Sequence, residues 1–179
     1  MGRLLFVLTF ALCAATASAQ ISQKVLIQGG KIVPVVGDVI ENGSILIENG
    51  KITAIGKDIK PPFDATVIDA TGKTILPGVV EPFTPRGTDR PNEGMDQGSF
   101  LHVSDAIDPS DPFFEDSLRA GYTSINIGQA DNAVITGVSR VVRPLGISVD
   151  EMTVRGDCGL KVIMSQKSGY DRSSQMASL

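Results

Sequence analysis

Short apolar runs separated by glycine and polar turn residues dominate the chain from residue 24 to residue 76. Asn49-Gly50 joins two of these runs and is a strong hairpin signal, because both turn residues must accept a positive φ. The spacing predicts several short β-strands and is typical of a small β-sandwich. The expected strands are 24–28, 31–36, 44–48, 51–56, 67–69 and 74–76.

The stretch from Pro77 to Gly87 predicts a further strand. Side chains two residues apart share one face of a strand, so we expect Glu81, Phe83 and Pro85 to point the same way. Prolines within the stretch argue against a central antiparallel strand and favour a strand that enters a barrel and ends at Pro85. Residues 88–104 are polar and without periodicity, which predicts a long loop.

Residues 108–112 predict the start of a helix, because Asp111 can cap the first turn and Pro112 suits that turn. Phe114 and Leu118 then share a face, and Gly121 fits the position after the helix. A helix followed at once by a strand is an α/β step of the barrel type.

The strand 122–127 is expected to direct Ile125 and Ile127 to one face, and Ser124 and Asn126 to the other. Residues 128–138 are expected to form a loop that contains glycine. Short strands are expected at 139–143 and 160–164. The tail from residue 165 is polar, with no cap and no regular apolar pattern.

The first nineteen residues predict a secretory signal peptide. Arg3 provides the positive start, residues 4–15 are apolar, and Ala17-Ser18-Ala19 forms a cleavage site before Gln20. Export to the periplasm or the medium follows, with no membrane segment after cleavage; a retained membrane anchor is the alternative. Cys158 would then be the one remaining cysteine, so we expect no internal disulfide.

Charge and motif content exclude several classes of function. The 179 residues include 16 Lys and Arg against 20 Asp and Glu, a net charge of −4. This mild acidity argues against nucleic acid or an anionic membrane as partner. The chain has no phosphate-binding loop, no dinucleotide fingerprint, no CxxC pair and no HExxH.

Five segments in one order resemble the amidohydrolase superfamily, in its secreted, imidazolonepropionase-like branch. In that family a leucine-proline-glycine leader, two aliphatic residues and an acid run into a histidine-x-histidine pair. Here the leader runs into Phe83-Thr84-Pro85. The five segments are Asn49-Gly50-Lys51-Ile52, residues 67–73, residues 76–80, residues 105–109 and Ala120-Gly121-Tyr122-Thr123-Ser124.

The resemblance implies an α/β fold in which a composite β-sandwich accompanies a (β/α)₈ barrel with its active site at the carboxyl ends of the strands. We therefore expect a signal peptide at 1–19, a composite β-sandwich domain at 20–76, and an incomplete metal-dependent-hydrolase barrel at 77–179. Such a barrel needs about 250 residues, so this chain would hold its first two or three strands.

The family hydrolyses C–N bonds in cyclic or linear amides with zinc or another divalent metal, which activates a bound water. By resemblance, Phe83 and Pro85 occupy the first two metal-ligand positions, and neither offers a ligand atom, so we expect no metal and no other cofactor in this chain. Glu81, Ser124 and Asn126 are candidate residues of the barrel lumen. His102, the one histidine, is expected in a loop away from this strand, and Arg86 is expected as a solvated loop residue.

Three functions are therefore open. The complete protein is a hydrolase of C–N bonds with a small-molecule substrate; or the fold is kept as an exported, non-catalytic pseudoenzyme or binding domain; or the chain is truncated and has no function of its own. By family we expect a hydrolase, and we expect this chain alone to be inactive. The catalytic residues, the substrate and the oligomeric state are not defined by the sequence.

Overall fold

The computed structural model describes residues 23–89, 97–131, 133–165, 169 and 171–177. The chain divides into two units, one ending at Pro77 and the other starting at Gly78. The expected signal peptide, 1–19, lies outside the described residues.

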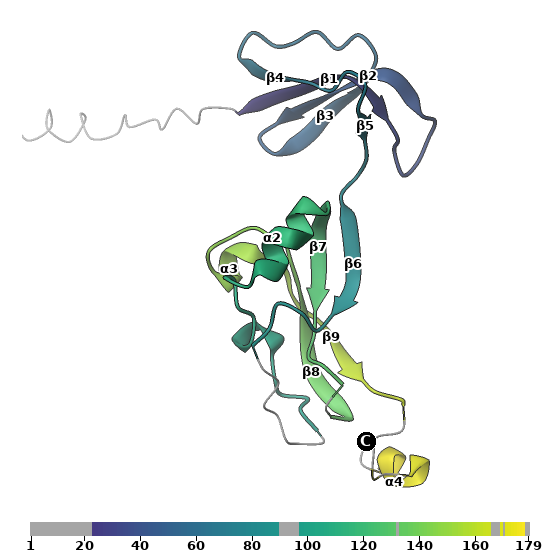
Figure 1. Ribbon diagram of the computed structural model, residues 1–179, viewed down its shortest axis with the longest axis vertical. Coiled ribbons are helices and arrows are strands. Elements are labelled where there is room, and N and C mark those ends of the chain that lie inside the picture. Colours follow the sequence, from purple (N-terminus) through teal and green to yellow (C-terminus); the bar gives the residue numbers. More distant parts are fainter. Residues whose placement is uncertain (1–22, 90–96, 132, 166–168, 170, 178–179) are drawn as a thin grey trace, which may run out of the picture. The chain divides into compact units, whose positions relative to one another are not determined.

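The first unit is a mixed sheet (Figure 1) whose central strand is β1 (Lys24–Ile32). It pairs antiparallel with β2 (Ile40–Glu48), which in turn pairs antiparallel with β3 (Lys51–Gly56). On its other side β1 pairs in parallel with β4 (Ala65–Asp69) and β5 (Thr74–Ile75). The β2–β3 hairpin turns at Asn49 and Gly50, whose φ angles are 52° and 73° as expected from the sequence.

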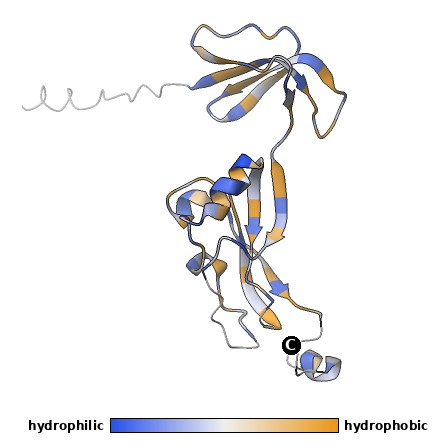
Figure 2. Ribbon diagram, in the orientation of Figure 1, coloured by the Kyte–Doolittle hydropathy of each residue, from blue (hydrophilic) through white to orange (hydrophobic). Residues whose placement is uncertain are grey.

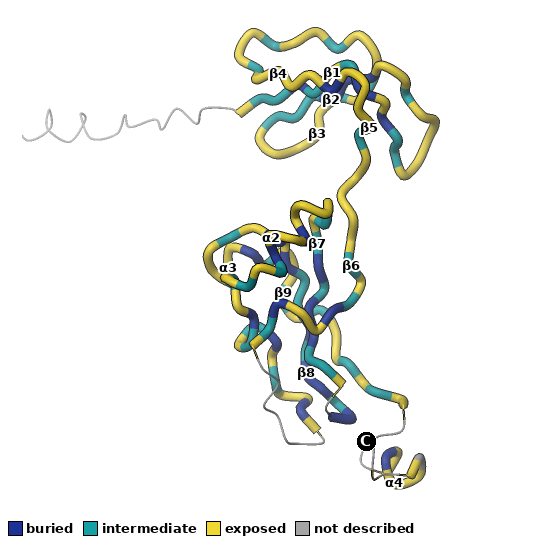
Figure 3. The backbone as a smooth tube through the Cα atoms, in the orientation of Figure 1, coloured by how far each residue is buried: buried dark blue, intermediate teal, exposed yellow. Residues whose placement is uncertain are grey.

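The described part of this unit forms one layer rather than a sandwich. All five strands are hydrogen-bonded into the same sheet, so none remains to form a facing sheet. One face therefore leaves Ile52, Ile55 and Ile68 exposed, at 60%, 47% and 48% (Figure 3). We expected a sandwich of two sheets, and this part of the chain forms a single sheet instead.

The second unit is a four-stranded sheet in the order β6-β7-β8-β9. β6 (Val79–Thr84) pairs in parallel with β7 (Tyr122–Ile127), and α2 (Pro112–Arg119) lies between them in the chain. This is the α/β step expected from the sequence. β8 (Ile135–Val142) and β9 (Thr153–Val162) then add antiparallel strands, so the parallel pairing of a (β/α)₈ barrel extends over two strands here.

The ends of α2 follow the sequence signals. The Asp111 carboxylate accepts a hydrogen bond from the Phe113 backbone N–H at 2.9 Å, and Pro112 is the first helical residue. Gly121, just after the helix, has a φ of 90°. Phe114 is buried, whereas Leu118, one turn later, is 43% exposed. The expected helix is therefore confirmed, and Phe114 is its main core contact.

The core of the second unit lies between the sheet and the helices. Burying each of its large apolar side chains stabilises the fold by about 2 kcal/mol. The apolar residues of β7 alternate as expected, with Ile125 and Ile127 fully buried. Figures 2 and 3 colour the strands of this sheet by hydropathy and by burial. The core cluster consists of Val103, Ile107, Phe114, Ile125, Ile127, Val142 and Met152.

The strands β8 and β9 differ from the expectation, because they begin at Ile135 and Thr153 and pair with each other as a long hairpin. The expected strands 139–143 and 160–164 are parts of them. Gly137 within β8 made the segment resemble a loop. It has a φ of 105°, and a Cβ at Gly137 would lie 2.6 Å from the Leu101 carbonyl oxygen.

Among the described residues, three short helices were not expected from the sequence. They are η1 (Val103–Asp105) within the expected loop, α3 (Val149–Met152) before β9, and α4 (Arg172–Ala177) in the tail. Asp171 caps α4 by accepting a hydrogen bond from the Ser174 N–H at 2.6 Å. Within the described residues, no helix is long and apolar enough to cross a bilayer.

Candidate functional site

The residues expected at the site lie on β6, whose register with β7 is irregular. Glu81 pairs with Ile125, and Thr84 pairs with Ile127, so three steps along β6 match two along β7. An extra residue of this kind is a β-bulge, and it reverses the alternation of side chains beyond it. Glu81 and Thr84 consequently both line a cavity between this sheet and α2, and Phe83 does not line it. The expected common face for Glu81 and Phe83 is not found.

Phe83 lies instead against a lysine from β9. The Lys161 ammonium is 4.2 Å from the centroid of the Phe83 ring. It donates a hydrogen bond to the Gln129 carbonyl oxygen at 3.0 Å and forms an ion pair with the Asp131 carboxylate. We call Phe83, Gln129, Asp131 and Lys161 the Lys161 cluster.

Gly128 makes room for this cluster. A Cβ at Gly128 would lie 2.5 Å from the Phe83 ring, so any larger residue would displace the ring. The Lys161 side chain is 21% exposed and Asp131 is 70% exposed, so most of the lysine side chain is covered while its acidic partner lies in solvent. A cation over an aromatic face is attracted by the negative potential of that face.

The residues present do not fit a divalent metal. Phe83 has no ligand atom, and Pro85 has no donor side chain and an exposed position. In the described part of the chain, no three His, Cys, Asp or Glu side chains come together as ligands. Catalytic zinc sites use three protein ligands of these types. Lys161 adds a positive charge beside Phe83.

Ser124 and Asn126 lie on β7, where hydrogen bonding was the expected role. The Asn126 side-chain amide donates to the Pro82 carbonyl oxygen at 3.0 Å and so ties the two parallel strands together. Its Oδ1 is buried and has no hydrogen-bond partner among the described residues. Ser124 is half-buried and pairs with Val80 in the sheet.

His102 lies against β9 and not on β6, the strand that carries Phe83. Its Nδ1 is 3.1 Å from Asp157 Oδ1, and both side chains are exposed. The sequence offered no signal for this pair, because 55 residues separate its members. Cys158, next to Asp157, is a half-buried free thiol.

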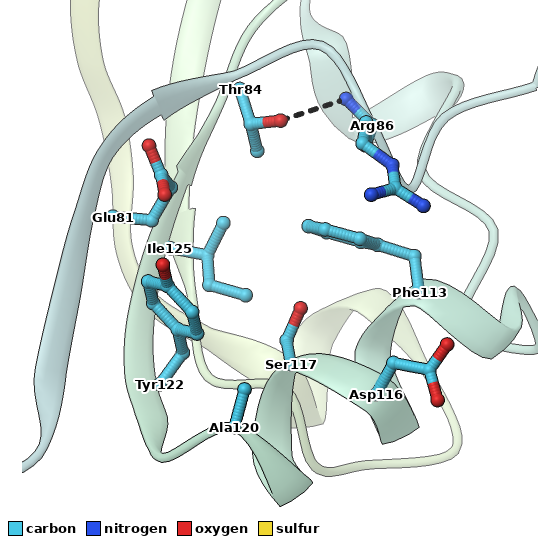
Figure 4. A pocket seen from close by; sticks show the side chains of 9 residues that line it. All are labelled: Glu81, Thr84, Arg86, Phe113, Asp116, Ser117, Ala120, Tyr122 and Ile125. Atoms are coloured by element: carbon cyan, nitrogen blue, oxygen red, sulfur yellow. Dashed lines mark hydrogen bonds between the residues drawn. The ribbon is translucent and has the colours of Figure 1, made fainter.

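A cavity of about 340 Å³ lies between the sheet and α2 (Figure 4). Glu81 and Arg86 lie on opposite sides of it, and the Ser117 hydroxyl points into it. We call it the α2 cavity. Its lining consists of Glu81, Thr84, Arg86, Phe113, Asp116, Ser117, Ala120, Tyr122 and Ile125.

Arg86 is held over the rim of the α2 cavity. Its guanidinium lies 4.8 Å from the centroid of the Phe113 ring, and its backbone N–H donates to the Thr84 hydroxyl at 3.2 Å. The Thr88 hydroxyl donates to the Pro85 carbonyl at 2.8 Å and closes the same turn. The sequence suggested Arg86 as a solvated loop residue; it is exposed, but its direction is fixed by Phe113.

Among the described residues, no opposite charge neutralises either of the two charges at the sides of the α2 cavity. Glu81 and Arg86 form no ion pair with any residue that the structure describes. The arrangement can therefore bind a small molecule that carries both charges. Sequence reasoning missed this cavity, because α2 and β7 supply most of its wall and the bulge in β6 brings Thr84 to the same face as Glu81.

Comparison with known proteins gives partial matches. No protein-family model matches the chain. Imidazolonepropionase from Geobacillus sp. (strain WCH70) is 41% identical over 76 residues, which cover 35% of this chain and 18% of that protein. Human dihydropyrimidinase-related protein 5 is 41% identical over 63 residues, covering 35% and 11%. Rat dihydropyrimidinase is 35% identical over 66 residues, covering 35% and 12%. The matched segment thus spans less than a fifth of each relative.

A crystal structure of an amidohydrolase from Thermotoga maritima MSB8 superposes with a TM-score of 0.73 and 24% sequence identity. The match covers 86% of this chain and 41% of that one. At this identity the likeness shows the fold. With the sequence relatives, it supports the amidohydrolase superfamily and an α/β fold like the N-terminal part of such a protein.

Proposed function

We propose that this chain is part of an amidohydrolase-type protein, a hydrolase of C–N bonds by descent, whose first barrel strand no longer holds a catalytic metal. The relatives named imidazolonepropionase and dihydropyrimidinase support the hydrolase class, and the structural neighbour supports the fold. The substrate of a complete, active protein would be a small molecule with a cyclic or linear amide.

The Lys161 cluster is the observation that carries the loss of the metal. The ammonium lies 4.2 Å from the Phe83 ring and pairs with the Asp131 carboxylate, a group that could otherwise bind a metal. A divalent ion would meet this positive charge and would find no ligand on Phe83 or Pro85. The described residues therefore support no metal-dependent hydrolysis at the end of β6.

Metal analysis tests this proposal. The purified full chain is incubated with zinc, desalted and measured by elemental analysis. We expect far less than one equivalent of zinc, and we expect the variant Phe83→His with Pro85→His to retain more, because two imidazoles are then available. A full equivalent of tightly bound zinc or manganese in the unmodified chain, lost on substitution within residues 81–86, would overturn the proposal.

A second candidate is an exported, non-catalytic binding protein. The α2 cavity favours it, because Glu81 and Arg86 face a space large enough for a small molecule and are not paired to each other. Under this alternative the signal peptide takes the protein to the periplasm or the medium, and the fold presents a ligand site without chemistry. Zinc analysis does not separate the two candidates, whereas a ligand titration does.

A further inference from the structure

We propose that the α2 cavity is a binding site for a free α-amino acid with an aliphatic side chain, whose ammonium group meets Glu81 and whose carboxylate meets Arg86. The site shares no residue with the Lys161 cluster, so it stands independently of the proposal about the metal. Charge, rigidity, polarity and size each support this ligand class.

The first support is the pair of uncompensated charges. Figure 4 shows Glu81 and Arg86 on opposite sides of the cavity, with open space between them. Glu81 is half-buried, and a carboxylate in that setting is stabilised by a cationic partner. No cation among the described residues pairs with it, nor does an acid pair with Arg86. A zwitterion supplies both missing partners.

The second support is the rigid placement of Arg86. Its guanidinium stacks at 4.8 Å on Phe113, and its backbone N–H donates a hydrogen bond to the Thr84 hydroxyl. Gly87, the next residue, has a φ of 77°, and a Cβ there would lie 2.6 Å from the Phe114 ring. The turn therefore loses little freedom when a carboxylate binds, and a planar guanidinium is suited to bidentate carboxylate contacts.

Asp116 is the competing carboxylate at the same cavity, and its position favours Glu81 as the partner of the ammonium. Asp116 is 72% exposed and lies 3.8 Å from Arg119, so its charge is solvated and shared with that cation. An exposed carboxylate attracts a cation weakly. Glu81, on the sheet side, is the less solvated of the two acids.

The remaining lining sets the size and polarity of the ligand. The buried Ser117 hydroxyl and the Tyr122 hydroxyl supply further hydrogen-bonding groups beside the charges (Figure 4). Phe113 and Ile125 supply an apolar wall for an aliphatic side chain. The volume of about 340 Å³ is at the lower end of ligand pockets, which suits one amino acid rather than a peptide.

Three probes separate the two charges in a titration of the full chain by calorimetry or ligand-observed NMR. L-Leucine carries both charges, L-leucinamide lacks the carboxylate, and 4-methylpentanoate lacks the ammonium group. We expect L-leucine to bind about tenfold more tightly than either analogue, since each analogue loses one charge-assisted contact.

Variants assign each charge to its residue. Arg86→Met should bring L-leucine down to the affinity of L-leucinamide, and Glu81→Gln should bring it down to that of 4-methylpentanoate. Arg86→Lys keeps a charge and should retain part of the preference for the carboxylate, which keeps the test usable if Arg86→Met does not fold. Glu115→Gln, which removes an acid outside the cavity, should change none of the three affinities.

Three results would overturn the proposal. They are no detectable binding of L-leucine at millimolar concentration, equal binding of all three probes, and unchanged preferences in folded Glu81→Gln and Arg86→Met proteins. Far-UV circular dichroism and a thermal melt establish that each variant is folded. Failure here leaves the proposed hydrolase ancestry intact, because that rests on the fold and the relatives.

Discussion

Lys161 should oppose metal binding even after ligands are restored to β6. The test compares the double variant Phe83→His with Pro85→His and the triple variant that also carries Lys161→Met. Methionine keeps an apolar stem of similar length and removes the ammonium. Its removal also releases Asp131, whose carboxylate now pairs with Lys161. The triple variant therefore offers up to three ligands and no opposing charge.

The expected loss of zinc affinity depends on whether Lys161 stays beside the ion or moves away, and the less costly of the two determines it. A divalent ion about 5 Å from a fixed ammonium would be repelled by about 7 kcal/mol at an effective dielectric of 20. Lys161 can avoid this repulsion by turning its side chain toward solvent, since that side chain is already 21% exposed. It then loses a cation–π contact, an ion pair to an exposed acid and one hydrogen bond, about 2 kcal/mol together. The penalty is thus about 30-fold in zinc affinity.

Competition with a chromophoric zinc chelator measures both affinities. We expect the triple variant to bind zinc about 30-fold more tightly than the double variant. A second triple variant with Lys161→Arg keeps the positive charge and should resemble the double variant. Equal affinities for the double variant and the methionine triple variant, within about twofold, would refute the reasoning that the ammonium obstructs the site.

Three further predictions concern the cap, acid stability and export. Asp111→Ala should lower the free energy of unfolding by about 1 kcal/mol in urea titration, because it removes the acceptor for the Phe113 N–H, and no change would contradict the capping role. The Thr71 hydroxyl, and then its N–H, lower the pKa of Asp69 below the ordinary 3.8, so the resulting stability is present above about pH 4 and lost on acidification through the folded pKa. Thr71→Val should weaken that pH dependence in thermal melts, and an identical profile would count against it. Mass spectrometry of exported protein should find Gln20 as the first residue; an intact Met1 would exclude the predicted cleavage.

The step from β6 through α2 to β7 could be predicted because its signals are local. Asp111, Pro112 and Gly121 determine the ends of the helix through contacts with their own neighbours in the chain. The alternation along β7 places Ile125 and Ile127 in the core without help from distant residues. Where local preference and tertiary packing agree in this way, sequence patterns give the correct element.

The missed features depend on contacts between distant segments. Gly137 looks like a loop residue, but its missing side chain lets Leu101 approach β8 within the sheet. The buried Gln175 of α4 donates to the Ile163 and Ser165 carbonyl oxygens at 2.9 Å, so the helix packs after the end of β9. A pattern of apolar residues along the chain contains no record of such pairings.

The bulge in β6 is the main reason why the sequence pattern did not predict the faces of Glu81 and Phe83. With perfect alternation, Glu81 and Phe83 would face the same side and would share one chemical environment. One extra residue before Thr84 separates them, and gives Glu81 to the α2 cavity and Phe83 to the Lys161 cluster. Two candidate sites therefore arise from one strand.

Under the proposal that β6 has lost a metal, the Lys161 cluster gives the strand a replacement for its charge. The resemblance implies a cation at the end of β6, and the structure supplies an ammonium that arrives from β9. Phe83 attracts it through the ring face, Asp131 neutralises it, and Gly128 leaves space for the ring. Because these residues act on one another, substituting Phe83 alone would leave Lys161 without its aromatic partner while the charge remained. Under this proposal, metal binding and the Lys161 ammonium are therefore alternatives, and we expect a variant that regains a metal to need Lys161 removed as well as ligands added.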